Sequence, residues 1–563
     1  MDAVWQMIIV AVAAVPFFSA FLIIVLQKKL GERAYKLSIY SAYLSVAAAA
    51  AEMMLFYLGD AEMPGAFTQT LFALHPTPVG VVLSFFVALV SVVIHRFSVK
   101  YMYDDPGYLR YFILLDLMIG DIFLLLLCGN ILMLAATWHM MGILLYFLLV
   151  HNFQKAQTVR YGFYTFFTHL LADIPLMFVV WIVYHHFQTT DIELFLSAAA
   201  EGQRTVASGF GITVGVSDLV ALLLVLSAMI KSTQFPFHLW LPFTLEGPTP
   251  VSALMHAGIV NAGAFLVNRF APVFAHADFA LHVALVAGLV TAIIGSTQML
   301  IQQDIKKALA YSTMGQMGYM MLEIGAGAFA LAVYHMMVHG LFKASLFLGS
   351  GGVIHDARLK ENIADTSLFD FYFSTPKGKT PSRTEYLLFV LILPALISML
   401  LFAPLIEAHG FKGVMVFYFF AWVSAAQVVY TIYHQAPVKR LRAVLSGTVG
   451  YALAIWFYVY AEKAINLTLY PDERVLDQII HSAVWPDIFM HAGAALGLLL
   501  IFAGAFVMYR RLLHKETLFT IFGGLHDSLY RLFSREFYIQ DFSESAAKKI
   551  VALSKRINDT MRY

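Results

Sequence analysis

The stretch KSTQFPFHLWLPFTLEGPTPVSALMHAG, residues 231–258, decides the fold of this chain. It begins with Lys231 at the end of an apolar segment. Its prolines are Pro236, Pro242, Pro248 and Pro250. Proline lacks the amide N–H of a helix interior and clashes with the preceding turn, so the stretch predicts a helix that breaks after Lys231. Thr249 and Pro250 then predict the next helix start, with threonine as N-cap and proline at the first helical position.

The composition indicates a membrane protein that is not an enzyme. The 563 residues are 60% hydrophobic and 13% charged, with a mean hydropathy of +0.75, far outside the range of soluble domains. The net charge of +1 and the absence of basic runs give no sign of nucleic-acid binding. The single cysteine, Cys128, excludes disulfides and cysteine-ligated iron–sulfur clusters within the chain. No nucleotide-binding or hydrolase motif occurs, and we expect no cofactor in this chain.

Ionisable residues flank the predicted break. Irregular backbone at membrane depth is tolerated only where it is buried in protein or lines a wet cavity. Ionisable residues at such a place mark ion paths. We therefore expect Lys231, Glu246 and His256 to border a path for ions.

Hydropathy predicts about fifteen membrane spans, each of roughly 18–25 apolar residues. They begin near Val4, Leu37, Gly80, Tyr111, Ile131, Gly162, Gly211, Pro250, Phe279, Ala308, Ala328, Tyr386, Gly413, Val444 and Pro486. The first lacks a basic leader and a small-residue cleavage pattern, so we expect it to be retained. Lysine and arginine gather on every second connection, which predicts the N-terminus outside and the tail in the cytoplasm.

The predicted fold class is an all-α polytopic membrane protein with broken helices and two inverted five-helix repeats. The expected divisions are N-terminal helices 1–3 at 1–110, a first repeat at 111–271, a second repeat at 279–434 with a cytoplasmic loop at 355–385, C-terminal helices at 444–510 and a cytoplasmic amphipathic tail at 511–563. Pro394 and Pro404 are the candidate break of the second repeat. In the tail, Ile550, Leu553 and Ile557 recur at helical spacing and predict an amphipathic helix.

Lys231 is the first candidate for an ion-carrying residue. A buried lysine beside a helix break can exchange its proton near neutral pH, although a lysine that snorkels from a helix end is an equal alternative. His256 can relay a proton or simply hydrogen-bond a neighbouring helix. Asp173 stands mid-helix, where an acid is costly unless paired, and Lys231 is its expected partner.

A second cluster is predicted from His335, His339 and Lys343 in YHMMVHGLFKASLFLGSGG. Offsets of four place the three on one helix face, as in a proton wire. The two histidines also have the spacing of a zinc pair, but the sequence lacks the glutamate of HExxH and Lys343 would repel the metal.

Further polar residues occur within or at the ends of the spans. One of Lys306 and Lys307 is expected to face inward, while the other anchors the topology. Glu52 is expected to have a structural or surface role. The others are Asp116, Asp121, His139 and Glu323.

Long motifs now resemble a known family. They are HRFSVKYMYDDPGYLRYF at 95–112, residues 231–258, QQDIKKALAYSTMGQMGYM at 302–320 and HMMVHGLFKASLFLGSGGVIH at 335–355. Over about residues 96–355 the chain resembles the antiporter-like subunits shared by respiratory complex I (the NuoL type) and Mrp cation/proton antiporters. The resemblance implies a proton- or cation-translocating subunit with two inverted five-helix units.

The resemblance also assigns roles to single residues. Lys231 matches the family's key lysine on the broken helix, Asp173 its acid on the preceding span and Lys306 a channel lysine. The remaining matches, to the family's polar axis, are His256, His335, His339 and Lys343.

Two departures indicate the branch. The family has Gly-Trp-Glu on the fifth span where this chain has Thr137-Trp138-His139, and 395–403 lacks the lysine of the second broken helix. With these two departures the chain resembles the branch of DabB, the membrane subunit of the Dab inorganic-carbon system. The resemblance then implies coupling of protons or Na+ to CO2 hydration by a DabA-like soluble zinc subunit on the cytoplasmic side of a bacterial inner membrane. The alternatives are an Mrp-type cation/proton antiporter subunit, a pump subunit of a respiratory or hydrogenase complex, and a membrane anchor that no longer transports.

Overall fold

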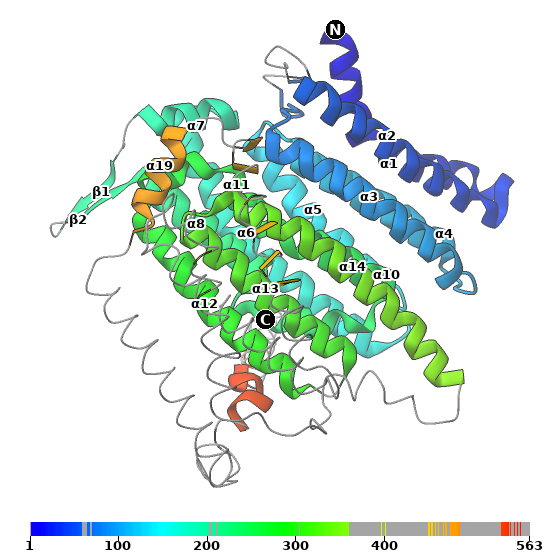
Figure 1. Ribbon diagram of the computed structural model, residues 1–563. Coiled ribbons are helices and arrows are strands. Elements are labelled where there is room, and N and C mark those ends of the chain that lie inside the picture. The colour runs from blue at the N-terminus through cyan, green and yellow to red at the C-terminus, as the bar shows by residue number, and fades with distance from the viewer. Residues whose placement is uncertain are drawn as a thin grey trace, which may run out of the picture.

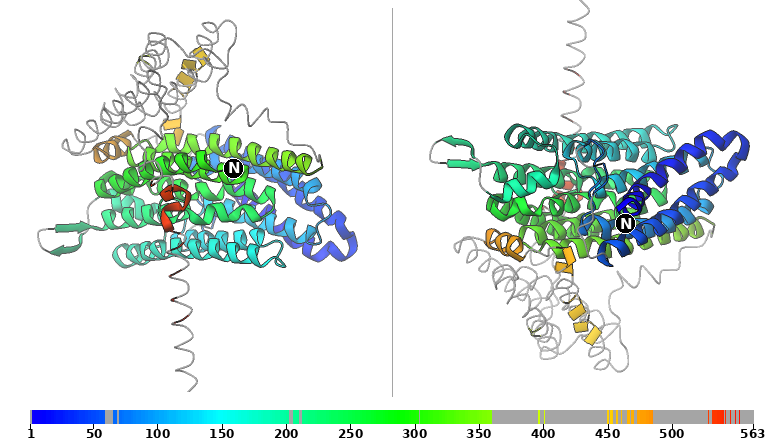
Figure 2. Two further views of the ribbon diagram at one scale, coloured as in Figure 1. Left: turned by 90° about the horizontal axis from the view of Figure 1, so that it is seen from below. Right: turned by 90° about the horizontal axis from the view of Figure 1, so that it is seen from above.

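The computed structural model describes residues 2–359 with short gaps at 59–64, 68–69, 202–204, 210–211 and 303, the stretches 473–484 and 531–539, and isolated positions beyond 395. The described residues form a bundle of long helices lying roughly side by side (Figure 1). Viewed from below and above, the helices stack in layers (Figure 2). The predicted all-α fold class is confirmed. The predicted break at Pro394 and Pro404 and the amphipathic tail helix lie outside the described residues.

The helices follow the predicted spans. The first seven are α1 Asp2–Leu30, α2 Tyr35–Leu58, α3 Pro78–Tyr101, α4 Tyr108–Leu127, α5 Ile131–Leu149, α6 Ala156–Phe187 and α7 Ile192–Glu201. The next are α8 Val216–Lys231, α9 Trp240–Phe243, α10 Thr249–Ala257, α11 Ala262–Arg269, α12 Asp278–Ile301, α13 Ile305–Gly325, α14 Phe329–Leu359 and α19 Glu473–Ser482. Seven helical segments of the described residues are long and apolar enough to cross a membrane, one of them joining α1 and α2.

Short elements connect these helices. The 3-10 turns are η1 Gly31–Ala34, η2 Phe237–Leu239, η3 Thr244–Glu246, η4 Ile259–Asn261, η5 Ala271–His276 and η7 Glu536–Tyr538. The strands β1 Thr205–Gly209 and β2 Ile212–Gly215 pair as an antiparallel hairpin. This hairpin, which projects from the bundle beside α7 (Figure 1), was not predicted from the sequence.

The two ends of the bundle differ in charge. One end, here called the basic end, carries the connections after α1, α3, α5 and α12, with Lys28, Lys100, Lys155 and Lys307. The other end, here called the opposite end, carries α7 and the hairpin. The predicted alternation of basic and non-basic connections therefore maps onto two faces of the fold.

The predicted break after Lys231 is confirmed. Helix α8 ends there because Thr233 adopts a left-handed φ of 54° and the Gln234 N–H donates to the Met229 carbonyl at 2.9 Å, which is a Schellman end. Three short turns, η2, α9 and η3, follow before α10 begins at Thr249. The prediction that Thr249 is the N-cap is wrong, since the helix already includes it and its hydroxyl lies 3.0 Å from that of Tyr101.

Helices α12 and α13 pack unusually closely. A Cβ atom at Gly295 would lie 2.5 Å from the backbone nitrogen of Gly315, so no larger residue fits there. Such small-residue contacts let backbones approach within membranes. This contact fixes α13, which supplies several side chains of the site below.

Candidate functional site

Lys231 is wholly buried at the end of α8. Its ammonium donates a hydrogen bond to the Trp138 carbonyl of α5 and lies 4.5 Å from the centre of the Trp138 ring. The face of an aromatic ring attracts a lysine ammonium through the ring quadrupole. Asp173 and Asp121 are the carboxylates whose charge acts on it. The predicted snorkelling alternative is wrong, because the side chain does not reach the surface.

Asp173 bonds a histidine and not the expected lysine. Its Oδ2 lies 2.6 Å from Nδ1 of His139, the residue that replaces the family's glutamate. The His139 side chain is 41% exposed and that of Asp173 is 13% exposed. The structure thus corrects the expected direct pairing of Asp173 with Lys231, which is an interaction through space.

Two further ionisable groups line this region. Asp121 of α4 is buried, and its Oδ2 has no hydrogen-bond partner. His169 of α6 is buried edge-on to Trp240, with 4.5 Å between ring centres. His169 was not among the residues predicted from the sequence, although its spacing of four residues before Asp173 places it on the same helix face. We call Lys231, Asp173, His139, Asp121 and His169 the first cluster.

The second cluster surrounds Lys343 on α14. The Lys343 ammonium donates to the Ser312 hydroxyl at 2.8 Å and to the Leu309 carbonyl at 3.3 Å. His339, one turn earlier, is buried beside it. The ring of His256 stacks on Phe347 with 4.1 Å between centres. The structure therefore brings His256 of α10 together with the predicted wire on α14.

His335 occupies the far end of this second cluster. Its Nδ1 lies 2.9 Å from Glu323 Oε1, and its Nε2 lies 2.8 Å from the Gln316 side chain. A carboxylate accepts from either form of the ring, and an amide can donate or accept, so both protonation states of His335 are satisfied. Both ring nitrogens are engaged, which argues against the zinc pair. The second cluster is defined as His256, His335, His339 and Lys343 with their bonded partners.

The residues of the break connect the two clusters. Gln234 donates to the Met317 carbonyl at 2.8 Å, next to the Gln316 that bonds His335. The Ser232 hydroxyl donates to the Val260 carbonyl at 2.6 Å in the turn that separates α10 from α11. The unwound backbone, which continues directly from Lys231 of the first cluster, therefore contacts elements of the second cluster.

Two predicted residues lie apart from these clusters. Glu246 is exposed at the end of η3. Lys306 is half-buried in the first turn of α13, and Lys307 beside it is exposed, as expected for one inward and one anchoring lysine. Neither side chain, that of Glu246 or that of Lys306, is bonded to a residue of the two clusters.

A turn from the C-terminal region covers the break at the basic end. The Tyr311 hydroxyl donates to the Glu536 carboxylate, and Phe537 contacts Phe235 with ring centres 5.4 Å apart. Gln298 donates to the Phe533 carbonyl at 2.6 Å. No local signal in the sequence predicted this contact, because more than 200 residues separate the partners.

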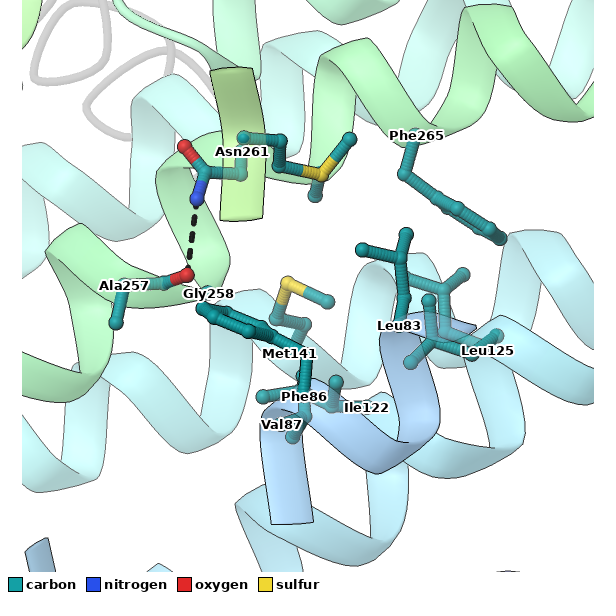
Figure 3. A pocket seen from close by; sticks show the side chains of 13 residues that line it. Leu83, Phe86, Val87, Ile122, Leu125, Met141, Ala257, Gly258, Asn261 and Phe265 are labelled. Carbon is teal, nitrogen blue, oxygen red and sulfur yellow. Dashed lines mark hydrogen bonds between the residues drawn. The ribbon is translucent and has the colours of Figure 1, made fainter. Parts of the chain in front are cut away.

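An apolar cavity lies beside the turn η4, which separates α10 from α11. It measures about 30 Å³ and its lining includes Phe86, Ile122, Met141 and Gly258 (Figure 3). Asn261 donates to the Ala257 carbonyl at 2.9 Å across the same turn. Because apolar cavities stay dry, this space, whose lining is apolar apart from Asn261, is a packing gap between α3, α4 and the turn η4.

Comparison with known proteins gives the family. Residues 128–373 match the family described as NADH:quinone oxidoreductase/Mrp antiporter, TM, and residues 68–112 match the complex I chain 5 N-terminus. A probable inorganic carbon transporter subunit, DabB1, of Halothiobacillus neapolitanus is 38% identical over 97% of this chain and 98% of its own length. The chain belongs to the antiporter-like membrane subunits that include DabB. It is accordingly a multi-pass membrane protein, like the other members of this family.

More distant relatives match in part, either over less of this chain or over a fraction of a longer one. Subunit L of the NADH-quinone oxidoreductase of Neisseria meningitidis is 34% identical over 47% of this chain and 40% of that subunit. The Mrp complex of Dietzia has a chain with a TM-score of 0.58 and 19% identity, covering 99% of this chain and 60% of that chain. These matches extend the family to complex I, and the Mrp likeness shows a shared fold.

Proposed function

We propose that this subunit conducts protons, or sodium ions, through the two clusters and couples the cation gradient to the accumulation of inorganic carbon. The observation that carries the proposal is a pair of buried lysines, Lys231 and Lys343, each in its own hydrogen-bonded cluster, with one unwound segment between them. Ionisable groups at membrane depth are costly and mark ion paths. An ion gradient supplies the energy, about 2.3 kcal/mol per charge per 100 mV.

The clusters suggest how charge moves. While Lys231 is charged, Asp173 and Asp121 balance it. When Lys231 loses its proton, the two acids lose their counter-charge, which favours protonation of the His139–Asp173 pair. At the other cluster, the proton of Lys343 has His339 and His335 as acceptors one and two turns away. The Gln234 contact allows the state of one cluster to affect the other.

The partner in this proposal is a DabA-like soluble zinc subunit that hydrates CO2. It would dock on the basic end, which would face the cytoplasm of a bacterial inner membrane, with the N-terminus outside. The likeness to DabB1 over nearly the full length supports this choice. The turn at Glu536 supports it further, because it places part of the C-terminal region against the break, where a docked partner could act on the path. Zinc would belong to the partner and not to this chain.

The first test is Lys231→Met, which keeps most of the side-chain volume and removes the charge. In cells that depend on this subunit for growth in air, we expect loss of bicarbonate accumulation. Lys307→Met is the matched control, since that lysine is exposed at the basic end. Accumulation that survives Lys231→Met at normal protein levels would overturn the proposed path.

The alternative is a subunit of an Mrp-type cation/proton antiporter, or of a respiratory or hydrogenase complex. The Mrp-like fold favours it. Deletion separates the two functions, because sodium-sensitive growth indicates antiport, whereas a requirement for high CO2 indicates inorganic-carbon uptake. Gentle purification separates them as well, since a large soluble zinc protein supports our proposal and iron–sulfur proteins contradict it.

A further inference from the structure

A second polar row lies within α1–α4, which lie together at one side of the bundle (Figure 1), and it shares no residue with the two clusters. Its hub is Asp116 of α4. The carboxylate accepts hydrogen bonds from Ser19 of α1 at 2.8 Å and Ser38 of α2 at 2.9 Å. Nε2 of His95 on α3 lies 3.1 Å from its Oδ1. All four side chains are buried, so four helices meet at one ionisable centre inside the membrane.

The His95–Asp116 pair holds a transferable proton. Nδ1 of His95 lies 2.7 Å from the Ser91 carbonyl, which can only accept, so Nδ1 carries a hydrogen. Nε2 faces a carboxylate oxygen at hydrogen-bond distance, so a second proton lies between them, on the ring or on the acid. Both arrangements are neutral as a pair. The proton can therefore shift between the ring and the acid without creating an unpaired charge, and when the pair passes the proton on, a second proton must arrive to restore neutrality.

The row continues along α2. Ser38, Ser41, Ser45 and Glu52 are separated by three, four and seven residues, which places them within about 60° of arc on one helix face. The bond from Ser38 to Asp116 fixes the direction of that face, into the bundle. Ser41, Ser45 and Glu52 are buried, and their side-chain oxygens have no hydrogen-bond partner within the part of the chain that the structure describes. Other residues of α2 such as Tyr40, which is 67% exposed, face outward.

Helix α3 contributes a matching face. Ser84, Ser91, His95 and Ser98 follow the same heptad-like spacing, and the contact of His95 with Asp116 directs this face toward the hub. The Ser84 hydroxyl is buried without a partner. The Ser98 hydroxyl lies 2.8 Å from that of Tyr111.

The row reaches the basic end. The ring of Tyr111 lies 5.9 Å from that of His151. Nε2 of His151 lies 2.8 Å from the carboxylate of Asp105, whose side chain is 34% exposed. Ionisable and hydroxyl groups therefore extend from the partly exposed Asp105 to Glu52, which is nearer the opposite end.

The chemistry of this row favours protons. Serines on a helix face do not by themselves mark a site. Glu52, however, is a fully buried acid, and keeping such an acid at membrane depth costs free energy, which is typical of functional sites. Burial favours the neutral carboxyl, which carries a proton. Ser38 and Glu52 are 14 residues apart, roughly 21 Å along the helix. That length is too great for the ligand shell of one cation and suits a relay.

We propose that Glu52, the aligned serines and the His95–Asp116 pair form a second proton route, distinct from the route through Lys231 and Lys343. Helix α4 separates the two, because Asp116 faces the new row and Asp121, five residues later, is the acid near Lys231. Water molecules would bridge the hydroxyls, as they do between buried polar groups elsewhere.

Proton uptake tests the route. The full chain with its native membrane partners is reconstituted in vesicles that contain a pH-sensitive dye. Lys231→Met should leave a residual uptake, and adding Glu52→Gln or Asp116→Asn should remove it. Glu32→Gln is the matched control, since that acid is exposed in η1. A residual uptake that Glu52→Gln leaves unchanged overturns the second route, as does the absence of any residual uptake in Lys231→Met.

If even the wild-type protein shows no proton uptake, the proposed function is contradicted. A labelling measurement then still tests the second route. A membrane-permeable carbodiimide reacts with protonated carboxyls in apolar surroundings. We expect mass spectrometry to find the adduct on Glu52, with its loss in Glu52→Gln and no change in Glu32→Gln. A Glu52 that stays unlabelled overturns the proposal, and protection by sodium chloride but not by choline chloride replaces the proton route with a cation site.

Discussion

Lys231 and Lys343 are both buried lysines near the centre of the bundle, but their surroundings differ. Lys231 donates a hydrogen bond to a backbone carbonyl and contacts an indole face, and two carboxylates act on its charge. Lys343 is bonded to a hydroxyl and a carbonyl, and its neighbours are histidines. Acids favour a charged lysine, whereas histidines can accept its proton or repel it.

The comparison suggests a division of roles. The carboxylates of Asp173 and Asp121 act on the charge of Lys231, and its loss removes that counter-charge from both acids. Lys343 is built to exchange its proton with His339, and His335 can partly replace it. Substitutions at the first lysine should therefore have larger effects than the same substitutions at the second.

The largest effect is expected for Lys231→Met. Loss of a positioned proton-transfer group typically costs about 10²–10⁴-fold, and we expect about 10³-fold in the cation flux of the reconstituted complex. Lys307→Met should match the wild type. A flux within a few-fold of the wild type would mean that the charge at Lys231 is not needed for transport.

Lys343→Met should have a smaller effect, about 10²-fold, at the lower limit of the same range. The reason is that His339 and His335 remain on the same face. The flux is measured in the same vesicles, with His335→Gln and the double variant in parallel. If Lys343→Met proves more damaging than Lys231→Met, the division of roles is reversed.

The His139–Asp173 bond should contribute about 1 kcal/mol to stability. A double-mutant cycle of His139→Gln and Asp173→Asn, read from thermal unfolding in detergent, measures the coupling. The expected size is the usual net contribution of one hydrogen bond, because the same groups find other partners in the unfolded chain. A coupling near zero would show that Asp173 serves Lys231 alone, which would sharpen the contrast with the second cluster.

The smallest effect concerns Glu193, which holds the end of α11 through Arg269 at 2.8 Å. Burial would raise the pKa of Glu193, but the Arg269 guanidinium, aided by His75, outweighs it and holds the pKa below its usual range. The folded pKa is depressed, so this stabilisation is present above about pH 4.5 and is lost as the pH falls through the folded pKa.

Because Glu193 is partly exposed, we expect this contribution to be at most about 1 kcal/mol. Thermal unfolding of the wild type and Glu193→Gln should differ at pH 7 and converge toward pH 4. An equal difference at both pH values would show that the charge of the Glu193 carboxylate does not hold the end of α11.

Much of the fold followed from local physics. The prolines after Lys231 predicted the break, because no proline-rich segment continues a helix. Offsets of four placed His335, His339 and Lys343 on one face, as the structure confirms. Glu52, expected to have a structural or surface role, is fully buried, because helix periodicity states which residues share a face but not what covers it.

The hydrogen-bond partners of the polar side chains were harder to predict than the helix faces on which these side chains lie. Asp173 was expected to bond Lys231 but bonds His139, since two residues on α5 and α6 meet only through the crossing of those helices. The contact of Glu536 with Tyr311 could not be predicted for the same reason.

By itself the sequence determined the membrane class, the helical spans, the break at Lys231 and the family. Hydropathy and proline chemistry act within one stretch of chain, and the long motifs can be compared with a family directly. Only the tertiary structure decided which acid meets which base. It separated the polar residues into two clusters and revealed the further row around Asp116, because the partner of a buried charge depends on how distant helices pack.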